Sequence, residues 1–266
     1  MDKIEKLSEL LKSYGKVCVA YSGGVDSTFL LSFAVRTLGR ENVLAATVRA
    51  SINPSYEIDE AEEMLKALGI DYLLIDSDVF AIEGFRENPV DRCYICKTAI
   101  FRNIIKKAGE KGFDRVVDGT NADDEGDYRP GMKALAELKV ASPLKESGLT
   151  KAEIRSISKD MDLATWDKPS LACLASRIPY HEEITEQKLR AVEAAEKYLF
   201  DKGFRQLRVR CHGNLARIEL SPDELDKLFD AAIMRDIDTE LKKLGFKYAA
   251  LDLLGYRTGS LNEVLK

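Results

Sequence analysis

Short apolar runs alternate with amphipathic segments along the first half of the chain. Apolar residues at helical spacing predict helices over residues 2–14, 28–38, 56–68 and 96–111. Runs rich in β-branched residues predict buried strands over residues 17–21, 43–48, 72–75 and 115–118, with a short fifth strand over 139–141. Strands that alternate with helices form a parallel sheet with helices on both faces, so this half predicts an α/β fold.

The pattern changes after Pro169. A charged amphipathic helix is predicted over residues 185–200, and strands over 206–211 and 215–220 flank a turn at Gly213 that is typical of a hairpin. A further helix opens near residue 221, and a last strand is expected over 248–253. These elements predict a smaller α+β domain at the C-terminal end. We therefore expect two domains, residues 1–168 and 169–266.

Composition argues against a membrane-spanning protein and against a nucleic-acid substrate, but it does not distinguish among other globular proteins. The 266 residues are 45% hydrophobic and 32% charged, as in an ordinary globular protein. The longest apolar stretches, residues 29–35 and 248–254, are too short to cross a bilayer, and no signal-peptide run follows the first residues. We therefore expect a cytoplasmic protein with no membrane partner. A net charge of −5 argues against a nucleic-acid substrate, because phosphate contacts favour a basic excess.

The strongest local signal is a glycine-containing loop between a predicted strand and a predicted helix. Its sequence, residues 22–27, is Ser-Gly-Gly-Val-Asp-Ser. The glycines let backbone N–H groups approach a ligand, and the following helix directs its positive end toward the same place. Asp26 suits the binding of Mg²⁺ on a phosphate. The loop is neither a Walker A motif nor a dinucleotide fingerprint, and on spacing alone a plain strand-to-helix turn is the alternative.

This loop resembles the signature of the PP-loop ATP pyrophosphatases, which include GMP synthetase, NAD synthetase, asparagine synthetase and tRNA-thiolating enzymes. The resemblance implies that the loop holds the pyrophosphate of ATP, which leaves with Mg²⁺ as a substrate oxygen is adenylated. It implies Mg²⁺ ligands at Asp26, which is also a candidate catalytic residue, and at Asp124. The implied ATP-binding residues are Ser22, Gly23, Gly24, Val25, Asp26, Ser27, Val48, Gly119 and Thr120.

Further motifs narrow the resemblance to the LarE family, which inserts sulfur in the synthesis of a nickel-pincer cofactor. Similar segments run through nearly the whole chain, at residues 119–124, 127–131, 142–145, 175–180, 208–210 and 216–219. The resemblance implies that ATP adenylates a carboxylate of pyridinium-3,5-biscarboxylic acid mononucleotide, and that sulfur then replaces AMP to give a thiocarboxylate.

The same resemblance implies that Ser176, Arg208 and Arg210 bind the phosphate of the mononucleotide. Arginines two positions apart on a strand share one face, so both could reach one phosphate. The alternative for this pair is two surface arginines on an edge strand.

Five cysteines in a chain without a secretory signal favour chemistry or metal binding over a disulfide framework. LarE-type enzymes either sacrifice the sulfur of one cysteine or carry three cysteines with a [4Fe–4S] cluster. In this chain the candidates are Cys93, Cys96 and Cys173, and three thiolates would leave one iron open for a sulfide. Cys173 is also the candidate catalytic cysteine if a single sulfur is sacrificed.

Other uses of these cysteines stay open. A structural zinc needs four ligands, and His181 could be the fourth. A redox Cys-x-x-Cys pair belongs at a helix start after a strand, whereas a loop over residues 89–92 is expected before Cys93. The cysteines could also be inert, with Cys173 alone catalytic. Cys18 lies in an apolar strand and is expected in the core, and Cys211 has no assigned role.

We therefore expect an ATP-dependent sulfurtransferase that uses ATP, Mg²⁺ and a [4Fe–4S] cluster. Its partners would be a small mononucleotide and sulfide or another sulfur donor, and we expect it to assemble as a homo-oligomer. One alternative is a tRNA-thiolating PP-loop enzyme, which the acidic charge disfavours. Another is an ammonia-dependent amidating ligase resembling NAD synthetase, which needs no cysteine trio. A nucleotide-sensing protein that never releases pyrophosphate is a third.

Overall fold

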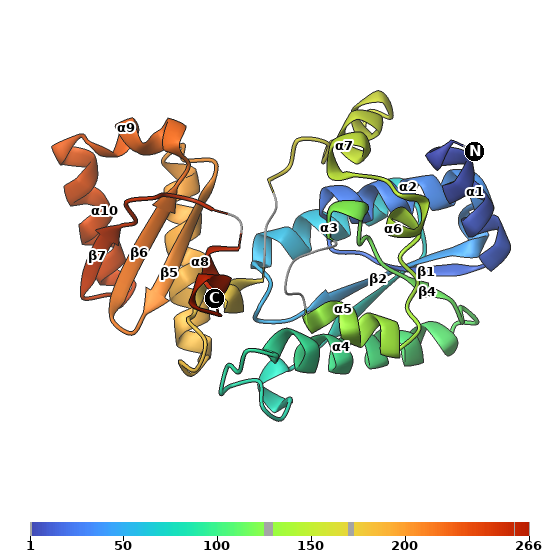
Figure 1. Cartoon of the computed structure of the whole chain (residues 1–266), viewed down its shortest axis with the longest axis horizontal. Helices are drawn as coiled ribbons and strands as arrows, with labels where there is room; N and C mark the ends of the chain where they lie inside the picture. The colour runs from blue at the N-terminus through green and yellow to red at the C-terminus, as the bar shows by residue number, and fades with distance from the viewer. Residues whose placement is uncertain (1, 125–129, 170–172, 258, 266) are drawn as a thin grey trace. The chain divides into compact units, whose positions relative to one another are not determined.

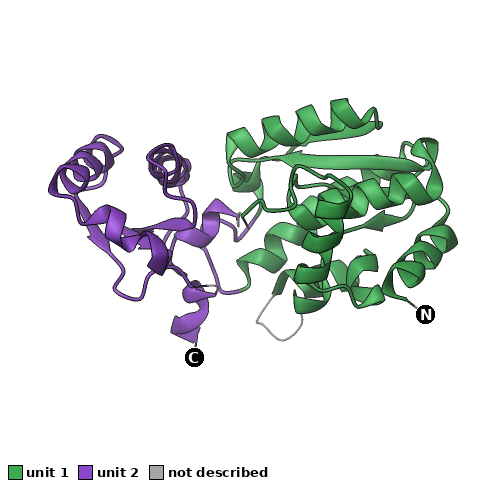
Figure 2. Ribbon diagram, turned by 90° about the horizontal axis from the view of Figure 1, so that it is seen from above, with its two compact units in different colours: residues 1–82, 91–171 green, residues 83–90, 172–266 purple. Residues whose placement is uncertain are grey.

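The computed structural model describes residues 2–124, 130–169, 173–257 and 259–265, which form two compact units (Figure 2). The first unit comprises residues 1–82 and 91–171, and the second comprises residues 83–90 and 172–266. The chain therefore contributes a short early segment to the second unit before it returns to the first. The domain ranges expected from the sequence, 1–168 and 169–266, stay a prediction.

The first unit is a parallel sheet covered by helices on both faces (Figure 1). Its strands are β1 (Val17–Ala20), β2 (Val43–Arg49), β3 (Tyr72–Asp76) and β4 (Val116–Val117), in the spatial order β3-β2-β1-β4. Its helices are α1 (Lys3–Tyr14), α2 (Val25–Leu38), α3 (Ser55–Leu68), α4 (Arg92–Gly109), α5 (Pro130–Glu137), α6 (Pro143–Ser147) and α7 (Lys151–Asp160). This arrangement confirms the predicted α/β fold. The expected strand over 139–141 is reduced to one isolated bridge, between Ala141 and Val117.

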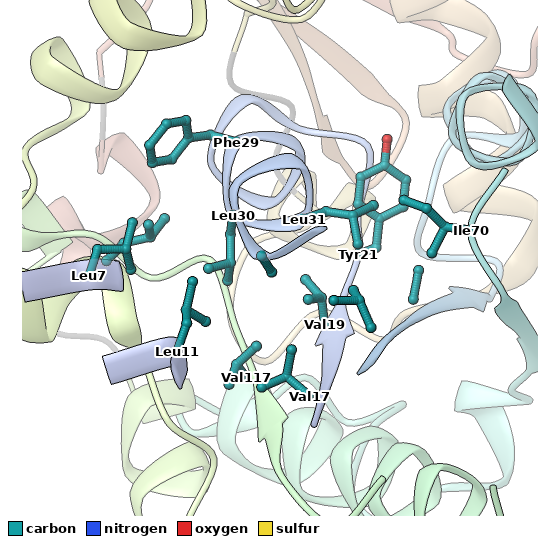
Figure 3. Close-up of a cluster of buried hydrophobic side chains, with 14 of the residues drawn as sticks. Leu7, Leu11, Val17, Val19, Tyr21, Phe29, Leu30, Leu31, Ile70 and Val117 are labelled. Carbon is teal, nitrogen blue, oxygen red and sulfur yellow. The ribbon is translucent and has the colours of Figure 1, made fainter. Parts of the chain in front are cut away.

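Alternation along the strands explains why both faces of this sheet are apolar. Successive side chains of β1 point to opposite faces, so Val17 and Val19 enter one core cluster and Cys18 enters the other. Helices α1, α2, α3, α6 and α7 cover the first face, whereas α4 and α5 cover the second (Figure 1). Figure 3 shows Leu30 and Leu31 of α2 in the first cluster with the β1 valines. The strands are therefore fixed at the centre of the unit.

Two helices begin earlier than their sequence patterns predict. Helix α2 begins at Val25 rather than at residue 28, because Gly24 takes the extended N-cap conformation with φ −82° and ψ 170°. Helix α4 begins at Arg92 rather than at residue 96. As a result Asp26 and Cys93 lie in first helical turns, not in the preceding loops. Apolar periodicity misses such residues because a first turn carries polar side chains.

The second unit contains a three-stranded mixed sheet, with strands β5 (Leu207–His212), β6 (Leu215–Leu220) and β7 (Tyr248–Leu251). Strands β5 and β6 form the predicted antiparallel hairpin, and β7 pairs with β6 in parallel. The helices are α8 (Glu186–Asp201), α9 (Leu225–Leu228) and α10 (Ala231–Lys243), with α8 packed on β5 and α10 on β7. The predicted α+β character is confirmed. None of the helices in the described part of the chain has the length and apolar character needed to span a membrane.

A capping box at the start of α7 fixes the position of that helix. The Thr150 hydroxyl accepts a hydrogen bond from the Glu153 N–H, and the Glu153 carboxylate accepts one from the Thr150 N–H at 2.9 Å. Replacing such a cap by alanine costs about 1 kcal/mol. We expect Thr150→Ala to lower the midpoint of thermal unfolding by about 2–4 °C in a calorimetric scan.

Thr239→Ala is the matched control for this prediction. Thr239 is exposed in the interior of α10 and donates to the Arg235 carbonyl, a bond that does not cap a helix. This variant should unfold within about 1 °C of the wild type, because alanine is the better helix former. Equal losses in the two variants would contradict the capping role of Thr150.

Candidate functional site

The glycine-containing loop folds over the N-terminus of α2. Gly23 has φ +72°, and a Cβ at this position would lie 3.0 Å from the Cβ of Ala61, so both backbone and space require glycine. The Ser27 hydroxyl accepts a hydrogen bond from the Ser22 N–H at 3.3 Å and donates to the Gly24 carbonyl at 3.2 Å. The two serine hydroxyls lie 3.1 Å apart. Residues 22–24 and the first turn of α2, residues 25–27, thus lie together at the positive end of that helix, which suits anion binding.

Asp26 faces a lysine that sequence reasoning missed. Lys151, the first residue of α7, places its Nζ 2.5 Å from Asp26 Oδ2, and its N–H donates to Asp123 Oδ2 at 2.8 Å. The other carboxylate oxygen of Asp26, Oδ1, is buried and has no hydrogen-bond partner among the described residues. The Thr150 capping box marks the helix start in the sequence, but it gives no sign that the next side chain reaches the loop.

The segment after β4 packs directly against this loop. A Cβ on Gly119 would lie 3.0 Å from the Ser27 nitrogen and 3.2 Å from the Ser27 Cα. Beside it, the buried Asp118 accepts hydrogen bonds from the Thr120 hydroxyl and, at 2.6 Å, from the Ser142 hydroxyl. The carboxyl ends of β1 and β4 therefore meet at one edge of the sheet, where ligands bind in open α/β folds.

Val48, a predicted ATP-binding residue, lies near the end of a strand of this sheet, and Asp124, a predicted Mg²⁺ ligand, lies after another. Val48 lies one residue before the end of β2, opposite Ile75 of β3. Asp124 ends a short 3-10 turn, and its Oδ2 accepts the Asn121 N–H at 3.0 Å. Residues 127–129 of the neighbouring motif lie outside the described residues.

The three predicted anion-binding residues of the second unit do come together. Arg208 and Arg210 of β5 are only 5% and 6% exposed, so the alternative of two surface arginines is wrong. Arg210 makes a two-pronged pair with Glu219, at 3.0 and 2.9 Å, and its Nη1 donates to the Ser176 carbonyl at 2.7 Å. The guanidinium of Arg208 lies over the ring of Tyr256, 5.1 Å from its centroid.

The charge balance of this cluster is positive. The buried guanidinium groups are Arg177, Arg208 and Arg210, and the buried carboxylates are Glu196 and Glu219. Burial, followed by the charge of Arg177, lowers the pKa of Arg208. A group whose charged form is disfavoured in this way gains stability from an added anion. Glu196 and Tyr256 were missed at the sequence level, because single charged or aromatic residues carry no distinctive pattern. Arg177 and Glu219 lie in segments that carry the family resemblance, 175–180 and 216–219, but they had no assigned role.

The cysteines fall into three kinds of environment. Cys93 and Cys96 lie one turn apart in α4 and hence on one face of the helix, and Cys93 Sγ accepts a weak hydrogen bond from Arg92 at 3.8 Å. Cys173 belongs to the second unit, where it caps the 3-10 turn Leu174–Arg177. Cys18 and Cys211 are buried, and burial raises the pKa of both thiols, that of Cys18 to about 12. Neither suits chemistry that needs a thiolate.

A search of the described residues finds no group of three or more His, Cys, Asp or Glu side chains that could hold a metal. The early start of α4 also bears on the alternative that Cys93 and Cys96 form a redox Cys-x-x-Cys pair, which requires a helix start directly after a strand. Cys93 is indeed at a helix start, but a short turn (Val79–Ala81) and the segment of residues 83–90 separate it from β3.

Comparisons with known proteins extend over both units. The NAD synthase family matches residues 3–113. An uncharacterized protein of Synechocystis is 40% identical over 99% of this chain and 98% of its own length. The pyridinium-3,5-bisthiocarboxylic acid mononucleotide synthase of Lactiplantibacillus plantarum is 36% identical over 96% of this chain and 92% of its own length. The argininosuccinate synthase of Haloarcula marismortui is 31% identical, but over 52% of this chain and 35% of its own length.

The contact between Gly119 and the loop gives a direct test of the site. In Gly119→Ala the new methyl group meets backbone atoms of Ser27, which cannot rotate away as a side chain would. Overpacking of this kind costs about 1–3 kcal/mol. We expect the variant to bind ATP roughly tenfold more weakly in a calorimetric titration, because the displaced atoms belong to the loop itself.

Gly109→Ala is the control for this substitution. Outside its own helix, a Cβ on Gly109 would meet only the Asp114 side chain among the described residues, at 3.9 Å, which is an ordinary contact. This variant should keep wild-type ATP affinity. Unchanged ATP affinity in a folded Gly119→Ala variant would show that ATP binding does not depend on the geometry of this loop.

Proposed function

We propose a function from one premise: the chain belongs to the family of the pyridinium-3,5-bisthiocarboxylic acid mononucleotide synthases, ATP-using enzymes of the PP-loop type. The protein adenylates a carboxylate of pyridinium-3,5-biscarboxylic acid mononucleotide and releases pyrophosphate. Sulfur then replaces AMP to give a thiocarboxylate. The observation that carries this proposal is the presence, in one chain, of a phosphate-type loop and a separate buried cluster with an excess of arginine.

Adenylation solves the problem that a carboxylate is a poor electrophile. A carboxylate oxygen attacks the α-phosphorus of ATP, the new P–O bond forms, and the bond to pyrophosphate breaks. Negative charge then develops on the pyrophosphate. The α2 N-terminus, the Ser22 and Ser27 hydroxyls and Lys151 supply positive charge and hydrogen-bond donors around that group. Sulfur displaces AMP in a second step, because AMP is a far better leaving group than oxide.

The loop also fits a magnesium ion. Asp26 Oδ1 is a buried carboxylate oxygen that no described residue hydrogen-bonds, which is the kind of ligand that Mg²⁺ takes alongside phosphate oxygens. We assign Asp26 as the main protein ligand and Asp124 as the second. When bound, the ion neutralises charge on the phosphates of ATP.

The second unit binds the mononucleotide phosphate in this proposal. Three buried guanidinium groups face two buried carboxylates, so a phosphate would balance the cluster rather than add to a surplus. A planar guanidinium can donate two parallel hydrogen bonds to two oxygens of one phosphate. We assign the contacts to Arg208, Arg210 and the Ser176 hydroxyl.

The sulfur site uses Cys93, Cys96 and Cys173. Cys93 and Cys96 lie one helical turn apart on α4, so both thiolates would be ligands of one cluster, with Cys173 as the third. When bound, a [4Fe–4S] group held by these three cysteines would supply an iron that can take sulfide. Sulfide or another small donor, a cytoplasmic location and a homo-oligomeric state belong to the same proposal.

The comparisons favour this function over its rivals. The NAD synthase family matches only residues 3–113, a span that leaves out Cys173 and nearly all of the second unit. An amidating ligase would use neither the cysteines nor the arginine cluster. The net charge of −5 disfavours a tRNA substrate. Pyrophosphate release in the presence of the mononucleotide would exclude a protein that only senses nucleotides.

Removal of the Lys151 charge should slow adenylation. We expect Lys151→Ala to release pyrophosphate about 10²-fold more slowly, because one preorganised donor near the developing charge is lost. The measurement is an enzyme-coupled pyrophosphate assay with ATP, Mg²⁺ and the mononucleotide. Lys159→Ala is the control, because Lys159 lies on the same helix with its Nζ over the Trp166 ring, 4.8 Å from the centroid. A full rate in Lys151→Ala would remove Lys151 from the proposed site.

The cluster is tested by iron and acid-labile sulfide in protein purified without oxygen. We expect about four irons and four sulfides per chain, with broad visible absorption. Cys93→Ala should lose both, and Cys211→Ala should keep both, because Cys211 is a buried core thiol. A colourless, metal-free wild type would leave only a sacrificial Cys173 or a ligase that transfers no sulfur.

A further inference from the structure

A buried ion pair in the second unit lies between the cysteine turn and α8. Arg177 ends the 3-10 turn that Cys173 caps, and its Nε and Nη2 each donate to one carboxylate oxygen of Glu196 at 2.9 Å. The two side chains are only 1% and 4% exposed. Such a pair adds little stability, since the cost of removing two charges from water offsets their attraction. Its other contacts are a better explanation for its presence.

The third nitrogen of Arg177 reaches the two functional residues of its own turn. Nη1 donates to the Ser176 hydroxyl at 3.0 Å and to the Cys173 carbonyl at 3.2 Å. The Cys173 carbonyl also accepts the Ser176 N–H at 2.9 Å. One rigid guanidinium therefore contacts the main chain of the cysteine and a hydroxyl of the anion-binding cluster. A lysine ammonium has a single nitrogen and could not make all these contacts together with the fork to Glu196.

Glu196 connects the same turn to the anion-binding strand. Its Oε1 accepts the Val209 N–H at 2.9 Å, and Val209 lies between Arg208 and Arg210 on β5. Arg210 closes the circuit with its bond to the Ser176 carbonyl. Hydrogen bonds thus link α8, β5 and the cysteine turn in a closed ring, so a shift of one member must displace the others.

We infer that Arg177, oriented by Glu196, is a positioning residue that holds Cys173 in a fixed relation to the anion-binding side chains Ser176, Arg208 and Arg210. Arg177 acts on the cysteine through the main-chain carbonyl of Cys173. The hydrogen-bonded ring is observed independently of the proposed function. The identity of the anion and the role of Cys173 in sulfur transfer rest on the proposed function.

The test compares Arg177→Lys with Arg190→Lys in the full chain. Arg190 forms an exposed pair with Glu186 on α8, so the control makes the same chemical change on the helix that carries Glu196. In iron-depleted protein, iodoacetamide should alkylate Cys173 roughly fivefold faster in Arg177→Lys than in the wild type, as followed by mass spectrometry of the Cys173 peptide. Arg190→Lys should match the wild type.

A second readout separates positioning from a general loss of structure. In iron-loaded enzyme, Arg177→Lys should form about tenfold less thiocarboxylate per pyrophosphate released, because a misplaced cysteine slows the sulfur step in addition to any loss of adenylation that displaced anion-binding side chains cause. An unchanged product ratio in folded Arg177→Lys would overturn the inference, even if alkylation became faster. An unchanged alkylation rate would overturn it as well.

Glu196→Gln keeps the experiment decisive if Arg177→Lys does not fold. Glutamine has nearly the same shape and keeps one acceptor for Val209, but it removes the charge that orients Arg177. The same two readouts apply, with Glu186→Gln as the control on the same helix. If the wild type itself releases no pyrophosphate, the proposed function fails, and the alkylation rates alone still decide whether Arg177 positions Cys173.

Discussion

The rest of the candidate site in the first unit depends on one packing constraint: the N-terminus of α2 lies against the carboxyl ends of the parallel strands β1 and β4. Gly24 caps α2 with no side-chain hydrogen bond, so the positive end of this helix is open toward the loop that precedes it. Gly119, two residues after β4, lies so close to the same turn that an added Cβ would be 3.0 Å from the Ser27 nitrogen. The apolar clusters on both faces of the sheet hold β1 and α2 in place, so the loop is positioned by the core rather than by its own few bonds.

The position of the α2 N-terminus also explains why the charged side chains of Asp26 and Lys151 lie together at this edge of the sheet. The positive end of a helix attracts a carboxylate, and Asp26 lies in the first turn of α2. Its charge is balanced on one oxygen by Lys151, whose helix is fixed by the Thr150 capping box. The second oxygen, Oδ1, is buried and has no hydrogen-bond partner in the part of the chain that the structure describes. A buried carboxylate oxygen without a partner is destabilising, so the arrangement favours a bound cation.

The sequence predicted the parts of this protein that depend on local pattern. Alternation of apolar runs gave the parallel sheet, and Gly23 with Gly24 marked the loop. Apolar patterning placed α2 and α4 three and four residues late, because polar first turns carry no apolar period. Lys151 and Glu196 were missed for another reason: their roles come from contacts made across the fold, which no spacing in one sequence reveals. Arg208 and Arg210 were found by resemblance, but their burial was not predictable.

The second unit shows why buried charge is better evidence of function than of stability. In many proteins a buried ion pair can be replaced by apolar residues of similar size without loss of folding stability. The pairs Arg177–Glu196 and Arg210–Glu219 are therefore not explained by stability alone. The chain nevertheless places three arginines and two glutamates in one cluster and uses four of them in two-pronged pairs. The fifth, Arg208, stacks on Tyr256 and has its charged form disfavoured by burial. The two fixed forks and the arginine stacked on Tyr256 are the features on which the proposed anion site rests. The ring through Glu196 ties Cys173 to that cluster, so in the proposed function binding of the anion and positioning of the cysteine would depend on the same hydrogen bonds.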